Sequence, residues 1–147
     1  MALRVVSVGI DTLADWQTIH NLIIPTSPLS VRDVAERSGR YRLTLGYHDA
    51  CLVGNATVRP PAHDVPIATV IVRILPEFRR RGFGSQYLEW VLSDARSLGA
   101  RRIETHVLAS NADGLSFAEH RGFVEFNRYL LDGHSISFIE LCLAEEG

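Results

Sequence analysis

Residues 67–98 read IATVIVRILPEFRRRGFGSQYLEWVLSDARSL. The first nine are nearly all apolar, as expected of a central strand covered on both faces, and Pro76 ends the run. After a short loop, apolar side chains recur at helical spacing and Gly99 suits a left-handed exit, which predicts a helix over 84–98. Another strand is predicted over 102–108. This order predicts a right-handed crossover that places the two strands parallel in one sheet.

The loop between this strand and helix is Arg79-Arg80-Arg81-Gly82-Phe83-Gly84. Unpaired backbone N–H groups and the helix dipole favour an anion at a helix start. The two glycines let the backbone approach a ligand closely, and the arginines add positive charge. We interpret the loop as a nest for pyrophosphate; the alternative is a glycine-rich turn with a solvated basic run. The Walker and GxGxxG patterns do not occur, which disfavours nucleoside triphosphates and NAD.

Two helices are predicted before the main strands of the sheet. Residues 4–8 read as a short strand, and Thr12 with Asp15 three residues later forms a capping-box-like start for a helix that ends at Pro25. Ser30 can cap a second short helix. These helices should shape the pocket for a second substrate, although they carry no recognisable recognition motif.

Alternating patterns predict further strands. Residues 40–48 alternate apolar and polar side chains, as in a strand with one buried face, and 51–59 read as its antiparallel return. After the strand over 102–108, Ser110 or Asn111 is expected to cap a short helix that ends at Gly122.

The last two predicted strands cover 124–131 and 135–143, joined by a hairpin turn at Asp132-Gly133. The apolar phase slips between Phe138 and Ile139. That slip indicates a bulge or a strand buried on both faces.

Composition limits the function classes. The 147 residues, 46% hydrophobic, fit one domain with one core, and a net charge of -2 disfavours nucleic acid and anionic membranes as partners. The start is too short and polar for a signal peptide, and no apolar run approaches the roughly 20 residues of a membrane span, so we expect a cytoplasmic protein. Cys51, Cys142 and the histidines show no ligand spacing, which makes a metal site improbable.

The chain resembles the GNAT acetyltransferase family, whose acyl-CoA loop carries Arg or Gln, two residues, Gly, one residue, then Gly or Ala. Arg79, Gly82 and Gly84 match this loop, and Asn111 stands eleven residues before Gly122-Phe123, as is common in the family. The segment ahead of the loop and Val53-Gly54 in the third strand also fit, so the resemblance covers most of residues 40–125.

The resemblance implies an α/β fold in a single domain over residues 1–147. The expected sheet is mixed, mostly antiparallel and of about seven strands, with about four helices. The order would be one strand, two helices, three strands, a helix, a strand, a helix and two strands.

The resemblance also implies an N-acyltransferase that moves an acetyl group from acetyl-CoA to a primary amine by direct attack. Acetyl-CoA is then the co-substrate, with no metal; the acceptor is unidentified, and a homodimer is one state that the sequence leaves open. Arg79 through Ser85 would bind the pyrophosphate, while the backbone of Ile74 and Asn111 would contact the pantetheine arm. The implied cofactor-binding residues are Ile74, Arg79, Arg80, Arg81, Gly82, Phe83, Gly84, Ser85 and Asn111.

The catalytic residues match the family less well. Many members carry a Tyr, as general acid, four residues before the Gly of the Gly-Phe pair, but here that position is Ala118. Ser116 and Tyr129 are weak substitutes. A thiol with a pKa of about 8.5 leaves tolerably as a thiolate, so transfer does not require the acid. A catalytically silent acyl-CoA sensor or regulatory domain is the alternative function, and a protein without a ligand is a third.

For the base, His106 takes the position of a Glu that serves this role in bacterial protein amino-terminal acetyltransferases of the family. An imidazole with a pKa near 6.5 suits proton acceptance around neutrality. A histidine packed in the sheet is the equally weighted interpretation. Glu104, on the same strand face, is the alternative base, and His63 and Asp64 rank below both.

Overall fold

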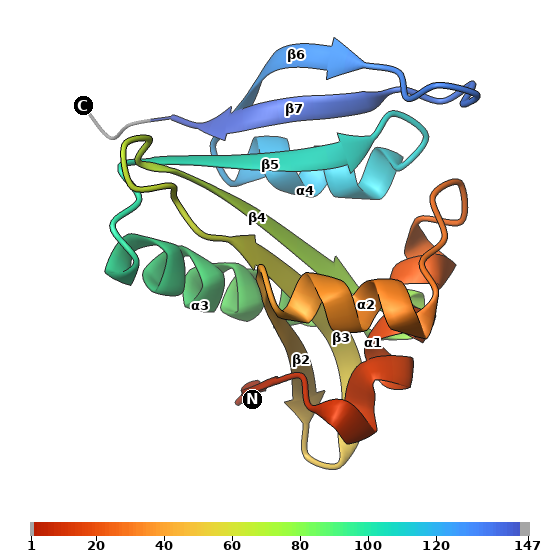
Figure 1. The fold of residues 1–147 in the computed structure, drawn as a ribbon. Helices are drawn as coiled ribbons and strands as arrows, with labels where there is room; N and C mark the ends of the chain where they lie inside the picture. The colour runs from red at the N-terminus through yellow and green to blue at the C-terminus, as the bar shows by residue number, and fades with distance from the viewer. Residues whose placement is uncertain (1, 145–147) are drawn as a thin grey trace.

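The protein forms one mixed sheet of seven strands in a computed structural model that describes residues 2–144 (Figure 1). The strand order is β1-β2-β3-β4-β5-β7-β6, and β4 with β5 is the parallel pair. This agrees with the predicted crossover and the predicted mixed sheet. The strands are β1 Arg4–Ser7, β2 Arg42–His48, β3 Cys51–Arg59, β4 Ile67–Ile74, β5 Arg102–Leu108, β6 Phe123–Tyr129 and β7 Phe138–Leu143.

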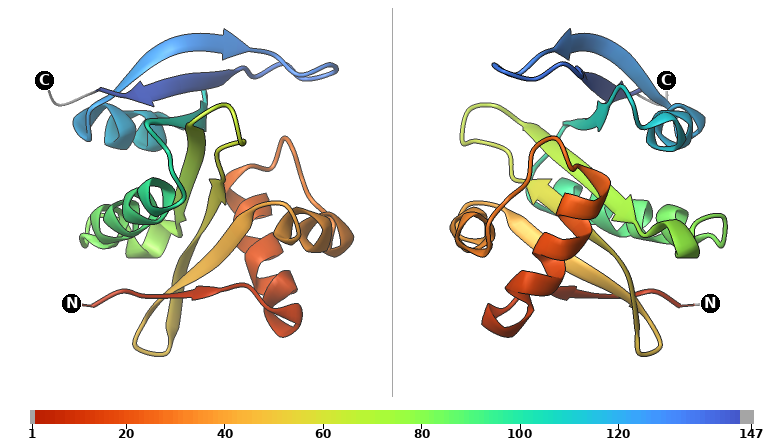
Figure 2. Two further views of the ribbon diagram at one scale, coloured as in Figure 1. Left: turned by 60° about the vertical axis from the view of Figure 1, so that its left-hand side comes forward. Right: turned by 90° about the vertical axis from the view of Figure 1, so that its right-hand side faces the viewer.

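Four helices cover the two faces of the sheet, in the order that the family resemblance implies. One layer contains α1 and α2, and the other contains α3 and α4 (Figure 2). None of the helices in residues 2–144 is long and apolar enough to cross a bilayer. The helices are α1 Leu13–Ile23, α2 Val31–Ser38, α3 Phe83–Ser97 and α4 Ala112–His120, with 3-10 turns at Ile10–Thr12 and Pro76–Phe78.

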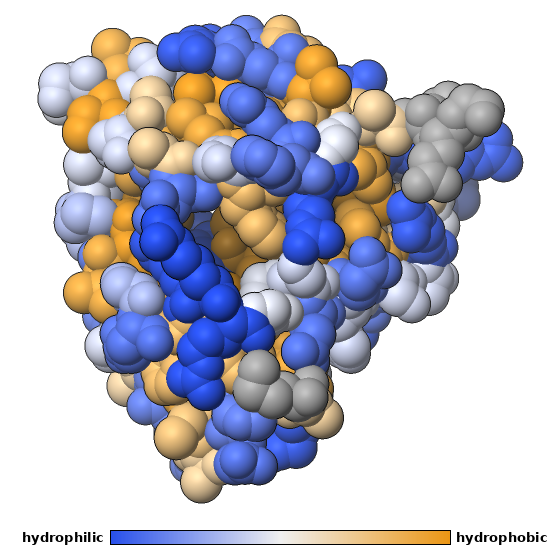
Figure 3. Space-filling model, turned by 180° about the vertical axis from the view of Figure 1, so that it is seen from behind, coloured by the Kyte–Doolittle hydropathy of each residue, from blue (hydrophilic) through white to orange (hydrophobic). Residues whose placement is uncertain are grey.

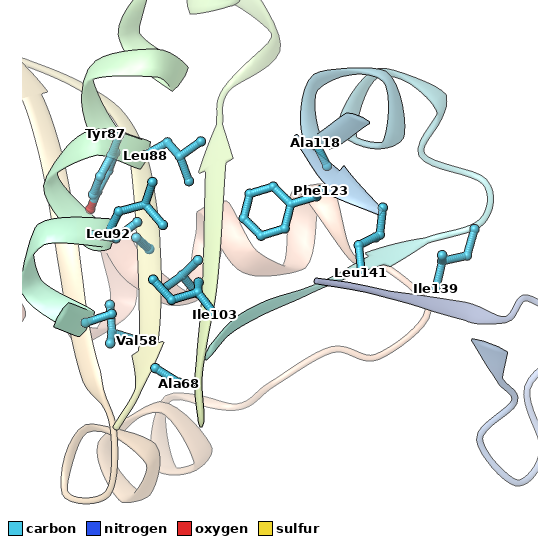
Figure 4. Close-up of a cluster of buried hydrophobic side chains, with 14 residues drawn as sticks. Val58, Ala68, Tyr87, Leu88, Leu92, Ile103, Ala118, Phe123, Ile139 and Leu141 are labelled. Atoms are coloured by element: carbon cyan, nitrogen blue, oxygen red, sulfur yellow. The ribbon is translucent and has the colours of Figure 1, made fainter. Parts of the chain in front are cut away.

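Each helical layer buries its own apolar core against the sheet. On the α1 side, Trp16 and Val34 are fully buried against Leu45 of β2. Figure 4 shows the other core, in which α3 packs on the strands and the apolar contacts continue beneath α4. The labelled side chains of that core are Val58, Ala68, Tyr87, Leu88, Leu92, Ile103, Ala118, Phe123, Ile139 and Leu141.

The sheet splits between β4 and β5. The two strands are eight and seven residues long, but their register holds only from Ile67 with Arg102 to Thr69 with Glu104. Beyond that point β4 stays with β3 and β5 stays with β7, so the strands diverge (Figure 1). The facing edges therefore carry backbone groups that have no partner strand, and such groups need another partner or solvent.

Two local predictions near the N-terminus were wrong. The Thr12 hydroxyl does not cap α1; a 3-10 turn precedes that helix, and the hydroxyl accepts from the backbone N–H of Gly9 at 2.8 Å. β2 is buried on both faces, because Thr44 points into the α3 layer and its hydroxyl lies 2.6 Å from the Tyr87 hydroxyl. Ser30 does cap α2, as predicted, by accepting from the N–H of Asp33.

The C-terminal hairpin also differs from the prediction. β6 ends at Tyr129 and β7 begins at Phe138, so residues 130–137 form a longer loop in which Gly133 has a φ of 80°. The register shift lies in β6, between Glu125 and Asn127, and not at the apolar slip in β7.

Candidate active site

A cleft of about 520 Å³ opens where the sheet splits. Its walls come from the end of β4, the loop after it, the first turn of α3, and α4. Ile23 of α1 and Arg73 of β4 also line it, so the cleft reaches through the split toward the α1 layer. On the face that α3 and α4 cover, Figure 3 shows a hollow with a hydrophobic floor and strongly hydrophilic side chains at its rim.

The backbone of the glycine loop presents donors to this cleft. Gly82 is the N-cap of α3, with a φ of 85° and no side chain to cap the helix. The first helical hydrogen bond runs from the N–H of Gln86 to Gly82, so the N–H groups of the preceding turn have no acceptor within the helix. Gly84 and Ser85 of that turn line the cleft, which gives this end of α3 the character of an anion site.

Gly84 also sets how closely α3 approaches α4. A Cβ atom at this position would lie 3.3 Å from the Phe117 ring and 3.8 Å from Ile74. Any larger side chain would push α4 or β4 away and fill the cleft floor.

The three loop arginines take different directions. Arg79 donates from Nε to the Ile74 carbonyl at 3.0 Å and lies 3.4 Å from the Asp113 carboxylate, so it ties the loop to β4 and α4. Arg80 lines the cleft and has a φ of 62°, an uncommon conformation for a residue with a side chain. Arg81 instead stacks on the rings of Phe78 and Phe83 and does not line the cleft.

Other implied cofactor-binding residues contribute in distinct ways. The Phe83 side chain is fully buried, which leaves its backbone as the part that can face a ligand. Asn111 caps α4 by accepting from the N–H of Gly114 at 3.0 Å, and it also lines the cleft. Asn111 is one of the two residues predicted to cap this helix. Because its side chain oxygen makes the cap, its amide N–H groups are left for a ligand.

Sequence patterns did not single out two arginines that line the cleft. Arg121, at the end of α4, donates to the Ser85 hydroxyl across the cleft. The contact joins residues 36 positions apart, and only the fold brings them together. Arg73 lies within an apolar strand pattern that gave no sign of a functional side chain.

A second cavity of about 80 Å³ adjoins the cleft, with Arg73 and Asn111 in the walls of both. His106 lines this second cavity, as does Ala118, the residue at the family's usual Tyr position. Ser116 lines the larger cleft instead.

His106 is held by two partners from the C-terminal hairpin. Its Nδ1 lies 3.0 Å from the Tyr129 hydroxyl, and its Nε2 lies 3.5 Å from Oε2 of Glu140. The side chain amide of Asn127 donates to the other oxygen of that carboxylate, Oε1, at 2.8 Å. Burial, and then Arg59, lower the pKa of His106, while Glu140 opposes this shift. The imidazole is therefore neutral near pH 7. Burial raises the pKa of Tyr129, so its hydroxyl stays protonated.

The alternative bases lie elsewhere. Glu104 sits where β4 and β5 are still paired, binds Arg102 at 2.7 Å, and lines neither cavity. His63 and Asp64 are exposed in the loop after β3 and also line neither cavity. Within residues 2–144 no group of three His, Cys, Asp or Glu side chains is arranged to hold a metal ion.

Comparison with solved structures identifies the fold. The ribosomal-protein-S18-alanine N-acetyltransferase of Escherichia coli is 20% identical, with a TM-score of 0.75 over 99% of this chain and 97% of that one. The yncA protein of Salmonella typhimurium, solved with its cofactor acetyl-CoA, is 14% identical, with a TM-score of 0.76 over 100% and 96%. NAA60 of Arabidopsis thaliana, in complex with a bisubstrate analogue, is 14% identical, with a TM-score of 0.78 over 96% and 97%.

Identities this low show a shared fold and leave the substrates open. A search of curated proteins found no match. The family model described as the Acetyltransferase (GNAT) family, however, matches residues 12–123, which include the glycine loop, Asn111 and His106. On this match and the shared fold, the chain belongs to the GNAT acetyltransferase family.

Proposed function

We propose that the protein is an acetyl-CoA-dependent N-acetyltransferase that transfers the acetyl group directly to a primary amine. The observation that carries the proposal is that two cavities at the split in the sheet share wall residues, among them Arg73 and Asn111. One contains the backbone donors of the glycine loop, and the other contains a neutral histidine. Both substrates of an acyl transfer can therefore meet between β4 and β5.

The donor would lie in the larger cleft. Its pyrophosphate would bind the first turn of α3 and the Arg80 side chain, with Arg79 holding the loop in place. Arg121 and Ser85 offer further donors to phosphate oxygens. The pantetheine arm would follow the free edge of β4 past Asn111, where its amide groups can bond to the unpaired strand backbone.

His106 would accept the proton of the acceptor amine, directly or through a water. In the tautomer that carries its proton on Nδ1 and donates it to the Tyr129 hydroxyl, Nε2 has a lone pair that can take the amine proton. Glu140, 3.5 Å from Nε2, would then stabilise the imidazolium as a positioning residue. The amine nitrogen attacks the thioester carbonyl, the C–S bond breaks, and solvent protonates the thiolate. No cysteine step is needed.

The test measures binding and turnover separately. Acetyl-CoA should raise the melting temperature, because a ligand that binds only the native state stabilises it. Free CoA thiol should appear with at least one member of an amine panel, and mass spectrometry should find the acetylated product. His106→Asn should lower kcat about 100-fold or more without changing the acetyl-CoA Kd, since His106 does not line the larger cleft. Absence of a thermal shift would exclude the proposal.

One observation favours a second candidate function. Ala118 places no hydroxyl in the second cavity, as expected of a silent acyl-CoA sensor. A sensor would show the acetyl-CoA shift but release no CoA thiol with any amine.

A further inference from the structure

Arg73 is a buried cation without an acidic partner. Its side chain is 4% exposed, on the α1 side of β4, with its guanidinium over the Trp16 ring. Nη1 donates to the side chain oxygens of Asn55 and Thr57 at 3.2 and 3.3 Å, and both of these are neutral. Nε is buried and has no hydrogen-bond partner among residues 2–144. Within that range, no carboxylate lies at ion-pair distance from Arg73.

Other positive charges surround this guanidinium. Burial, and then Arg37 and Arg59, lower the pKa of Arg73 to about 9, so it still carries its charge at neutral pH. The Nε of Arg59 is also buried without a partner in the described part of the chain, beside the Tyr41 ring. Three arginines from α2, β3 and β4 therefore create a positive field on this face of the split.

Two carboxylates on the neighbouring strands do not neutralise this field, because each has another partner. Glu140 binds Asn127 and faces His106, and Glu104 binds Arg102. Of the titratable groups of α1, Asp15 is exposed to solvent, and the buried His20 is neutral, because burial and then Arg73 lower its pKa to about 4.

A core position would not need such a charge. A buried unpaired ion is unfavourable, and an apolar side chain of similar size would fill the same space at lower cost. Arg73 also lines both cavities, at the junction where an acceptor would meet the acetyl group, and His106 lines the second of them. An anion that enters from this side would supply the missing partner, and a guanidinium can bind a carboxylate with two parallel hydrogen bonds.

We propose that the acceptor is an amine that also carries an anionic group, as an amino acid does. Its carboxylate, or a chemically similar phosphonate, pairs with Arg73, in the positive field of Arg37 and Arg59, while its amino group faces His106. Polyamines and other cationic acceptors are repelled by the same arginines. This substrate class rests on the proposed function, because it concerns the acceptor of that reaction.

The experiment compares matched acceptors that differ in one charge. Each L-amino acid is assayed beside its carboxamide, with saturating acetyl-CoA at one pH. For the preferred amino acid, kcat/KM should exceed that of its amide at least tenfold. Arg73→Met should remove this preference by raising the KM of the acid, and Arg73→Lys should restore part of it. A structural role alone would lower both rates together and leave their ratio unchanged.

Arg42→Met is the matched control. Arg42 is the first residue of β2, pairs with Asp94 at 2.6 Å and lines neither cavity. Its loss should therefore leave the ratio of acid to amide kcat/KM unchanged. If Arg73→Met does not fold, Arg59→Met provides a second comparison, because it removes part of the same positive field from the partly exposed end of β3 and should lower the preference for the acid.

Three results would overturn the inference. They are equal rates for acids and amides in the wild type, a preference for the amides, and a ratio unchanged by Arg73→Met and Arg59→Met. Each of these leaves the proposed acetyl transfer standing, because the amides are acetylated. Acetyl-CoA binding without transfer to any amine would instead overturn the proposed function together with this inference.

Discussion

Replacement of His20 by glutamine should remove a large part of the acid sensitivity of the fold. His20 is 4% exposed, stacks on Trp16 and lies 3.0 Å from the Asn21 side chain oxygen through Nδ1. Burial, followed by Arg73, lowers its pKa from 6.5 to about 4. As the pH falls, His20 therefore takes up a proton in the unfolded chain before it does so in the folded chain. Its contribution to the stability of the fold is fully present above pH 6.5 and is lost as the pH falls toward 4.

The size of the effect follows from that shift. Between pH 7 and 4.5, a group titrating at 6.5 in the unfolded state and about 4 in the folded state removes about 2.5 kcal/mol of unfolding free energy. Urea unfolding gives the free energy of unfolding at both pH values for the wild type and for His20→Gln. The loss of stability between the two pH values is then compared between the two proteins, so the contribution of the carboxylates, which both proteins share, cancels. The exposed His63→Gln is the control and should behave as the wild type. An equal loss of stability in wild type and His20→Gln would refute the reasoning.

Three further predictions test the loop, the sheet and the base. Arg80→Ala should weaken acetyl-CoA binding by about 1 kcal/mol, roughly fivefold, in calorimetry, whereas Arg81→Ala should not, because its guanidinium stacks outside the cleft; equal losses would contradict this. Gly54→Ala should lower the free energy of unfolding by about 1–3 kcal/mol in urea, because its Cβ would lie 2.2 Å from the Arg73 carbonyl oxygen, and an unchanged midpoint would be incompatible with that contact. The lowered pKa of His106 means that kcat/KM should rise with pH through a midpoint below 6.5 and level off by neutrality, and a midpoint above 7 would point to another base.

Much of the fold was readable from the sequence because its local and long-range signals agree. The apolar run before Pro76, the glycine loop and the periodic helix after it identify a crossover that has one standard hand. The strand ends at Arg59 and Leu108 also match the structure, since two prolines follow the first and a turn before Asn111 follows the second.

Other features depend on contacts that sequence patterns do not record. Thr44 looked solvent-facing because it is polar, yet the Tyr87 hydroxyl satisfies it inside the α3 layer. Arg80 and Arg81 look equivalent in the sequence. In the structure the backbone of Arg80 turns at a φ of 62°, so Arg80 lines the cleft while Arg81 stacks on Phe78 and Phe83. Arg73 was hidden for a similar reason, because one charged residue in an apolar strand gives no sign of which cavity it will meet.

The parting of β4 from β5 has a kinetic consequence. Residues of both α1 and α4 line the two cavities, so in the proposed reaction the opening faces both helical layers, and one substrate can enter without the other having to leave. Free CoA should then compete with acetyl-CoA but act as a noncompetitive inhibitor toward the amine. Double-reciprocal plots should intersect rather than run parallel.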